Sequence, residues 1–174
     1  MEVCKRKKVL FSKEEINTRV KSLGEELSNY YNDKDLLVVS LLRGSFIFAA
    51  DLIREISVPL EVDFITTASY GNNEVSPGTV DIVHDLRTNV EGKDVLIVDD
   101  IIDSGYTIEK VIEHIQGKNP KSIKICVMLD KPSRRKVDLT PDFNGFTIPD
   151  VFIVGYGLNY GDHYRNTPYV FTFE

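Results

Sequence analysis

The chain has 174 residues, of which 42% are hydrophobic, so it is long enough to bury the core of one compact domain. Its formal charge of -6 argues against a nucleic-acid-binding surface, and we expect the short basic run at residues 5–8 to be a solvated tail. It has only two cysteines, no apolar segment long enough to cross a bilayer and no apolar core of a secretory signal. These features predict a cytoplasmic protein without membrane contacts or a disulfide framework.

The first part of the chain alternates between helical and strand patterns. Ser12 and Glu15 form a capping-box pair at the start of a predicted helix, whose apolar residues follow at helical spacing. The continuous apolar run at residues 36–42 predicts a buried strand, and residues 46–56 predict a second helix after an Arg-Gly turn. The order of helix and strand therefore repeats along the chain.

The same alternation continues to the end of the sequence. Residues 69–78 contain glycine, asparagine and proline and predict a mobile loop or hairpin. Alternating elements without a linker or internal repeat predict a single α/β domain over residues 1–174, with a mainly parallel sheet flanked by helices. Further strands are expected at residues 60–68, 79–83, 122–129, 151–154 and 169–173.

The most informative stretch of the chain is residues 95–107. Four apolar residues lead directly into Asp99 and Asp100, and Asp103 follows at the start of a turn. Apolar residues then recur at helical spacing, so this loop joins the carboxyl end of a buried strand to the start of a helix. Open α/β sheets bind ligands at such places. The remaining polar or glycine residues of the turn are Ser104, Gly105 and Thr107.

The residue types in this loop indicate a ribose phosphate as the ligand. Hydroxyls and an unobstructed backbone at a helix N-terminus suit a phosphate. Asp99 and Asp100 would repel that phosphate unless a sugar ring separated the charges, because sugar hydroxyls donate hydrogen bonds to carboxylates. Mg2+ on the same hydroxyls would complete the charge balance. A ribose 5-phosphate is the simplest ligand of this kind.

The stretch resembles the signature of the type I phosphoribosyltransferases, which binds 5-phosphoribosyl 1-pyrophosphate (PRPP). The resemblance implies the fold of that family, with a small hood and a flexible lid loop. It implies that Asp99 and Asp100 hold the ribose hydroxyls, and Mg2+ through those hydroxyls or water. It makes Asp103 the catalytic acceptor of the N7 proton of the base. The 5-phosphate is assigned to Asp103, Ser104, Gly105, Tyr106 and Thr107.

Two more segments take their roles from this resemblance. Leu42, Arg43 and Gly44 match a loop that clamps pyrophosphate and often contains a non-proline cis peptide, here between Leu42 and Arg43. Ser69 and Tyr70 match a pair that closes over the reaction centre, where a lid would protect an oxocarbenium-like ribosyl cation from water. Without the resemblance, the first segment predicts only the turn that leads into a helix, and the second predicts only the exposed tip of a hairpin.

The last third of the chain resembles the hypoxanthine-guanine phosphoribosyltransferases. By that resemblance Lys131 donates to the 6-oxygen of a purine, Phe152 stacks on the base, and Ile153 offers backbone groups to its edge. An ammonium group can only donate, which favours hypoxanthine or guanine over adenine. Arg165 matches a second pyrophosphate-binding cation. Asn159 stands where the family has aspartate, so we expect a weaker second Mg2+ site.

These expectations describe a Mg2+-dependent enzyme of purine salvage. It would join hypoxanthine or guanine to the ribose of PRPP and release pyrophosphate. Two alternatives stay open, namely a PRPP-sensing regulator of the same fold that binds nucleic acid, and a transferase that prefers xanthine or another base. The acidic balance of the chain argues against the regulator. The resemblance further implies small-molecule substrates, no nucleic-acid or membrane partner, and a homodimer or homotetramer.

Overall fold

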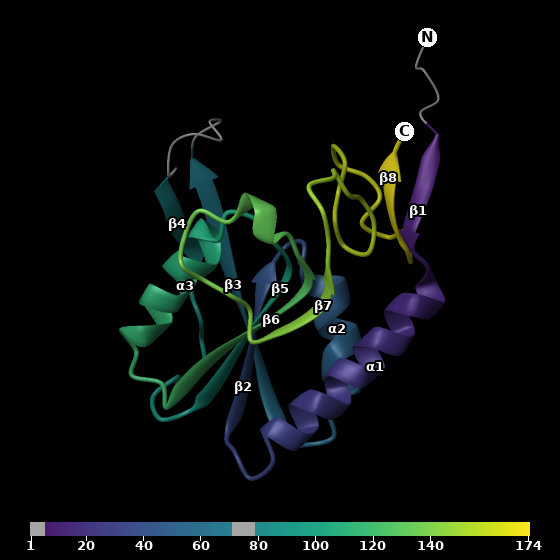
Figure 1. Ribbon diagram of the computed structural model, residues 1–174. Coiled ribbons are helices and arrows are strands. Elements are labelled where there is room, and N and C mark those ends of the chain that lie inside the picture. The colour runs from purple at the N-terminus through teal and green to yellow at the C-terminus, as the bar shows by residue number, and fades with distance from the viewer. Residues whose placement is uncertain (1–5, 71–78) are drawn as a thin grey trace.

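Figure 1 shows the computed structural model, which describes residues 6–70 and 79–174. Its central feature is a six-stranded sheet that is parallel except at one edge, where the strand formed by residues 79–84 runs antiparallel to its neighbour. The mainly parallel α/β sheet expected from the sequence is confirmed. In spatial order the strands are β4 (Thr79–His84), β3 (Leu60–Tyr70), β2 (Leu36–Leu42), β5 (Asp94–Ile102), β6 (Ser122–Asp130) and β7 (Phe143–Thr147).

Helices cover both faces of the sheet. α1 (Lys13–Tyr30) and α2 (Phe46–Arg54) share one core with alternate residues of β5, whereas α3 (Tyr106–Gln116) packs on the opposite face (Figure 1). The central residues of β5, at positions 95–98, contribute to both cores, which explains why they show no polar alternation. A short 3-10 helix, Pro132–Arg134, follows β6. The layers expected from the sequence are therefore present.

The start of α1 shows how local sequence fixes an element boundary. The Ser12 side chain accepts a hydrogen bond from the Glu15 backbone amide at 3.1 Å, and the Ser12 amide donates to the Glu15 carboxylate at 2.8 Å. The predicted capping box is confirmed. It stabilises the first turn of the helix by satisfying two amides that have no partner within the helix.

A second, smaller sheet pairs the two ends of the chain. β1 (Lys7–Phe11) runs antiparallel to β8 (Val170–Phe173), and these strands together with the loops of residues 151–169 form what we call the hood. Figure 1 shows the hood beside the carboxyl ends of the central strands. The basic run was expected to be a solvated tail. Residues 7 and 8 are exposed, but their backbone belongs to a strand and not to a tail. They are ordered because β8 supplies strand partners.

Of the predicted strands, one is absent and one lies outside the central sheet, and one strand of the structure was not predicted. Residues 151–154 do not form a strand; their contact is an isolated bridge between Val154 and Phe171, because they lie in the hood away from the sheet. The last strand pairs with β1 and does not extend the central sheet. β7 was not predicted, since its short sequence FNGFT has no long apolar run.

The loop expected at residues 69–78 begins later than predicted. Ser69 and Tyr70 belong to β3, where their backbones pair with Val80 and Thr79 of β4. Strand pairing with β4 extends β3 beyond the apolar run that predicted it. The remainder of the predicted lid, residues 71–78, lies outside the described residues.

Asp63 connects β3 to the segment that follows β4. Its buried carboxylate accepts hydrogen bonds from the backbone amides of Phe64, Arg87 and Thr88, each at 2.8 Å. Burial alone would raise the pKa of Asp63, but the three amides outweigh it and hold the pKa below its usual range. The ionised carboxylate therefore stabilises the folded chain.

We expect Asp63→Asn to lower the free energy of unfolding by about 1–3 kcal/mol at neutral pH, because an amide group cannot satisfy all three donors. A lowered folded-state pKa means that this contribution is present above the unfolded-state pKa and is lost as the pH falls through the folded-state value. Urea titrations between neutral and acid pH measure the effect. The exposed Asp138→Asn is the control, and equal pH profiles of the two variants would contradict the assignment.

Candidate active site

The signature loop lies at the carboxyl end of β5, an interior strand of the sheet. Asp99 and Asp100 belong to the last part of the strand, and Asp103 begins the turn into α3. Gly105 occupies the N-cap position with a φ of 90°, a left-handed conformation that favours glycine. The loop lines an open pocket of about 250 Å3. Its lining includes Asp99, Asp103, Ser104, Gly105 and Thr107.

The adjacent carboxylates of Asp99 and Asp100 determine the electrostatics of this end of the sheet. Burial raises the pKa of Asp99 well above its usual range, and the neighbouring Asp100 charge raises it further. Burial also raises the pKa of Asp100, whereas its hydrogen bond with Asp99 and the Arg165 charge act in the opposite direction. Two such close carboxylates favour ligands that donate hydrogen bonds or carry positive charge.

The loop after β2 lies directly against this acidic pair. The peptide bond between Leu42 and Arg43 is cis, as the family resemblance suggested. Gly44 follows, and a Cβ atom at this position would overlap the Asp100 carboxylate. Ser45 anchors the end of the loop, because its buried hydroxyl binds Ser40 Oγ at 2.7 Å and the Leu41 carbonyl. The structure therefore brings two segments together that are 50 residues or more apart in the sequence.

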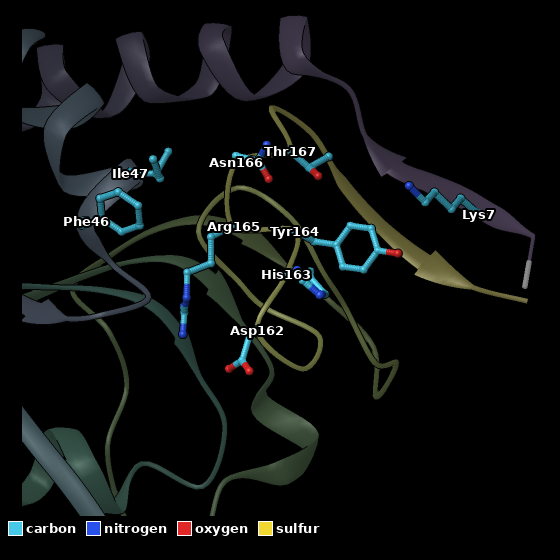
Figure 2. Close-up of a pocket in the computed structure, with 9 residues that line it drawn as sticks. All are labelled: Lys7, Phe46, Ile47, Asp162, His163, Tyr164, Arg165, Asn166 and Thr167. Atoms are coloured by element: carbon cyan, nitrogen blue, oxygen red, sulfur yellow. The ribbon is translucent and has the colours of Figure 1, made fainter. Parts of the chain in front are cut away.

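Arg165 approaches the same region from the hood. Its Nη1 atom donates to the Gly157 carbonyl at 2.7 Å, and the Gly157 amide donates back to the Arg165 carbonyl at 3.0 Å. Figure 2 shows a pocket between the hood loop that contains Arg165 and the first residues of α2. The pocket has a volume of about 790 Å3. Its lining residues are Lys7, Phe46, Ile47, Asp162, His163, Tyr164, Arg165, Asn166 and Thr167.

Lys131 and Asp103 form an ion pair in the site. Lys131 is only 4% exposed, and its Nζ atom lies 3.5 Å from Asp103 Oδ1 and donates to the Val151 carbonyl at 3.0 Å. Asp103 Oδ1 is buried and makes no hydrogen bond with the described residues. A buried lysine requires polar partners, and the Asp103 carboxylate and the Val151 carbonyl supply them here.

The other predicted base-contacting residues lie in the hood. Phe152 is 60% exposed and packs edge-on against Tyr160, with ring centroids 5.8 Å apart, so one face of its ring is open to a ligand. Ile153 is buried in the core beneath it. Asn159 is exposed, and its Nδ2 atom donates to the Gly161 carbonyl at 2.5 Å, which holds the side chain over its own turn.

Arg135 is a residue of the site that the sequence analysis missed. Its guanidinium donates to the Asp103 carbonyl at 3.0 Å and forms an ion pair with Asp130, while the next residue, Lys136, donates its amide to Ser104 at 2.9 Å. The segment after β6 thereby supports the signature loop. In the sequence, Arg135 is recognisable only as a basic residue four positions after Lys131. Basic residues are common on protein surfaces, so this position does not indicate a role in the site.

The acidic residues of the site could bind Mg2+ if water and a ligand supplied its other coordination positions. Within residues 6–70 and 79–174 no group of three or more histidine, cysteine, aspartate or glutamate side chains could hold a metal ion by itself. Mg2+ commonly takes one or two carboxylates and completes its sphere with water and ligand phosphates. Asp99 and Asp100 provide a donor set of this kind.

Within residues 6–70 and 79–174, no helix has the length and apolarity required to cross a membrane.

Comparisons with known proteins extend over most of the chain. A family model described as a phosphoribosyl transferase domain matches residues 10–161. A hypoxanthine-guanine phosphoribosyltransferase from Bacillus subtilis is 52% identical over 163 residues, which cover 94% of this chain and 91% of that protein. A hypoxanthine phosphoribosyltransferase from Salmonella typhimurium is 51% identical over 164 residues, covering 93% and 92% of the two chains. The crystal structure of a hypoxanthine phosphoribosyltransferase from Staphylococcus aureus matches with a TM-score of 0.92 at 42% identity, covering 96% of this chain and 91% of that chain.

Proposed function

Because the chain belongs to the phosphoribosyl transferase domain family, we propose that it is a purine salvage enzyme that transfers the 5-phosphoribosyl group of PRPP to N9 of hypoxanthine or guanine. The products are inosine or guanosine monophosphate and pyrophosphate. The observation that carries this proposal is the signature loop with Lys131 Nζ 3.5 Å from Asp103 Oδ1. Residues 1–174 act as one phosphoribosyltransferase domain.

The sugar phosphate binds along the signature loop. Asp99 and Asp100 accept hydrogen bonds from the two ribose hydroxyls, and the 5-phosphate binds where α3 begins. The first amides of α3 have no partners within the helix, and the helix dipole favours an anion there. The residues of the phosphate site are Asp103, Ser104, Gly105, Tyr106 and Thr107.

The purine lies between Lys131 and Phe152. The Val151 carbonyl holds the Lys131 ammonium at 3.0 Å, so the group is positioned to donate to a 6-oxygen. Adenine has a 6-amino group at this position and offers the ammonium no acceptor. Phe152 stacks on the base with its open ring face, and Ile153 contributes backbone groups at the base edge. Xanthine differs from guanine only at the 2-position, which these residues distinguish poorly.

Asp103 acts as the general base. Its side chain is 47% exposed, so a ligand can reach the carboxylate, and the N7 proton of the purine is the proton that it takes. Loss of that proton makes the base a better nucleophile for the ribosyl carbon. The Lys131 ammonium lies 3.5 Å from Asp103 Oδ1 and helps to fix the position of the carboxylate.

The leaving pyrophosphate binds between Arg165 and the loop of Leu42, Arg43 and Gly44. Mg2+, when bound, neutralises part of the pyrophosphate charge and polarises the bond that breaks. Asp99 and Asp100 would hold the ion through ribose hydroxyls or water. Ser69 and Tyr70 are the pair that closes over the reaction centre. Exclusion of water then protects the ribosyl cation during transfer.

The transfer reaction provides the first test. Purified protein with Mg2+ and PRPP should form nucleotides from hypoxanthine and guanine and none from adenine. Asp103→Asn should lower kcat by about 100-fold with little change in the dissociation constant of PRPP, because only proton transfer is lost. The exposed Asp138→Asn is the matched control. Near-normal turnover by Asp103→Asn would exclude its role as the base, and absence of nucleotide formation by the wild-type protein would exclude the function.

Asn159 makes the second Mg2+ site weaker without abolishing turnover. An amide oxygen can bind Mg2+, but it brings no charge. We expect Asn159→Asp to lower the Mg2+ concentration for half-maximal pyrophosphate binding by about threefold to tenfold. Calorimetric titration of pyrophosphate at several Mg2+ concentrations measures this directly. Asn17→Asp, on the exposed surface of α1, adds the same charge elsewhere, and an unchanged Mg2+ dependence in Asn159→Asp would refute the proposal.

The protein forms a homodimer or homotetramer in the cytoplasm. Support comes from an exposed phenylalanine on the side of the sheet that carries α1 and α2. Phe64 of β3, which points away from the α3 side because Ile65 packs there, is 47% exposed. A large exposed apolar side chain on a sheet face is typical of a surface that binds another protein chain.

We expect Phe64→Glu to shift the protein toward the monomer, because a charge on this face opposes its burial. Size-exclusion chromatography with light scattering over a range of protein concentrations measures the mass. Val9→Glu, which places the same charge on another exposed apolar residue, in β1, should leave the mass unchanged. A wild-type protein that is monomeric at all concentrations would contradict the proposal.

A further inference from the structure

A buried tyrosine connects the hood to α2. Tyr156 is 4% exposed, and its hydroxyl donates to Asp51 Oδ2 at 2.5 Å. The other carboxylate oxygen, Asp51 Oδ1, pairs with Arg54, so each oxygen has its own partner. Burial and the Asp51 carboxylate raise the pKa of Tyr156, so the hydroxyl keeps its proton and can donate. The contact joins residues that are 105 positions apart in the sequence.

The residue after Tyr156 lies against the pyrophosphate loop. Gly157 has a φ of 96°, and a Cβ atom on it would overlap the Gly44 carbonyl and lie 3.7 Å from Ile47 Cβ. Gly44 in turn lies so close to Asp100 that it has no room for a side chain on that side. The loop is therefore held between the hood and the acidic end of β5.

The same glycine fixes Arg165. The Gly157 carbonyl accepts from the Arg165 guanidinium at 2.7 Å, and the Gly157 amide donates to the Arg165 carbonyl at 3.0 Å. The backbone of Tyr156 also takes part, because its amide donates to the Thr167 carbonyl at 2.8 Å. Any shift of Gly157 would thus move both Arg165 and the surface that supports Gly44.

From this arrangement we propose that Tyr156 and Asp51 are a positioning pair for the leaving group. Their hydrogen bond holds Gly157 against Gly44 and thereby sets the distance between Arg165 and the pyrophosphate loop. This inference rests on the proposed assignment of residues 42–44 and Arg165 to pyrophosphate. Neither Tyr156 nor Asp51 contacts the reactants in this scheme; the pair acts through the groups that it places.

The experiment compares the binding of pyrophosphate with the binding of inosine monophosphate, which occupies the same site but contains no pyrophosphate. In Tyr156→Phe the ring still fills its core position, and only the hydroxyl is removed. We expect the dissociation constant of pyrophosphate with Mg2+, and the KM for PRPP, to rise about tenfold. The dissociation constant of inosine monophosphate, which has no pyrophosphate, should change less than about twofold. Isothermal titration calorimetry and steady-state kinetics measure these values.

Variants of the acceptor test whether the hydrogen bond itself is responsible. Asp51→Asn keeps an acceptor oxygen and should retain most of the pyrophosphate affinity, whereas Asp51→Ala should match Tyr156→Phe. The double variant Tyr156→Phe/Asp51→Ala should be no weaker than either single variant, because both remove the same interaction. Tyr31→Phe is the matched control, since Tyr31 is fully buried and its hydroxyl makes no hydrogen bond with the described residues.

Two outcomes would overturn the inference while the assignment of the site stands. Equal weakening of inosine monophosphate and pyrophosphate in Tyr156→Phe would show a general structural role, and unchanged affinity for both would show no role. Thermal unfolding of each variant confirms that the protein is folded during the measurement. Unchanged pyrophosphate affinity in Arg43→Ala and Arg165→Ala would instead overturn the assignment itself, and the inference with it.

Discussion

Burial of β5 on both faces is the constraint on which the site depends. Its residues 95–98 belong to the cores on the two sides of the sheet, so the strand cannot shift or rotate without exposing one of them. The carboxylates of Asp99 and Asp100 are consequently delivered to one fixed place at the carboxyl end of the sheet. A charge-rich site can be held there because the free energy that stabilises it comes from apolar burial elsewhere.

The parts of the fold that follow from local sequence were predictable. The capping box of Ser12 and Glu15, the apolar run of β2 and the signature loop each depend on neighbouring residues. β1 and β8 do not, because each is stabilised by a partner at the opposite end of the chain. A short basic segment such as residues 7 and 8 shows no strand pattern without that partner, and residues 151–154 resembled a buried strand only because the hood also has an apolar interior.

The residues of the candidate site also differ in whether local sequence could identify them. Asp99, Asp100 and Asp103 could be identified from one continuous motif, whereas Arg135 and Tyr156 could not. These last two act through backbone carbonyls or distant side chains, and such contacts leave no characteristic spacing in the sequence. The family resemblance predicts residues that contact ligands, whereas the contacts that support those residues are visible only in the structure.

The pairing of β1 with β8 has a consequence for biosynthesis. β1 is synthesised early, but its pairing partner β8 is synthesised last. The hood therefore cannot form until residue 173 has left the ribosome. The central sheet has no such requirement, since its last strand ends at Thr147. The strands of the central sheet are thus synthesised before the hood, and the hood residues Ile153, Tyr156 and Val170 complete the core shared with α1 and α2 only afterwards.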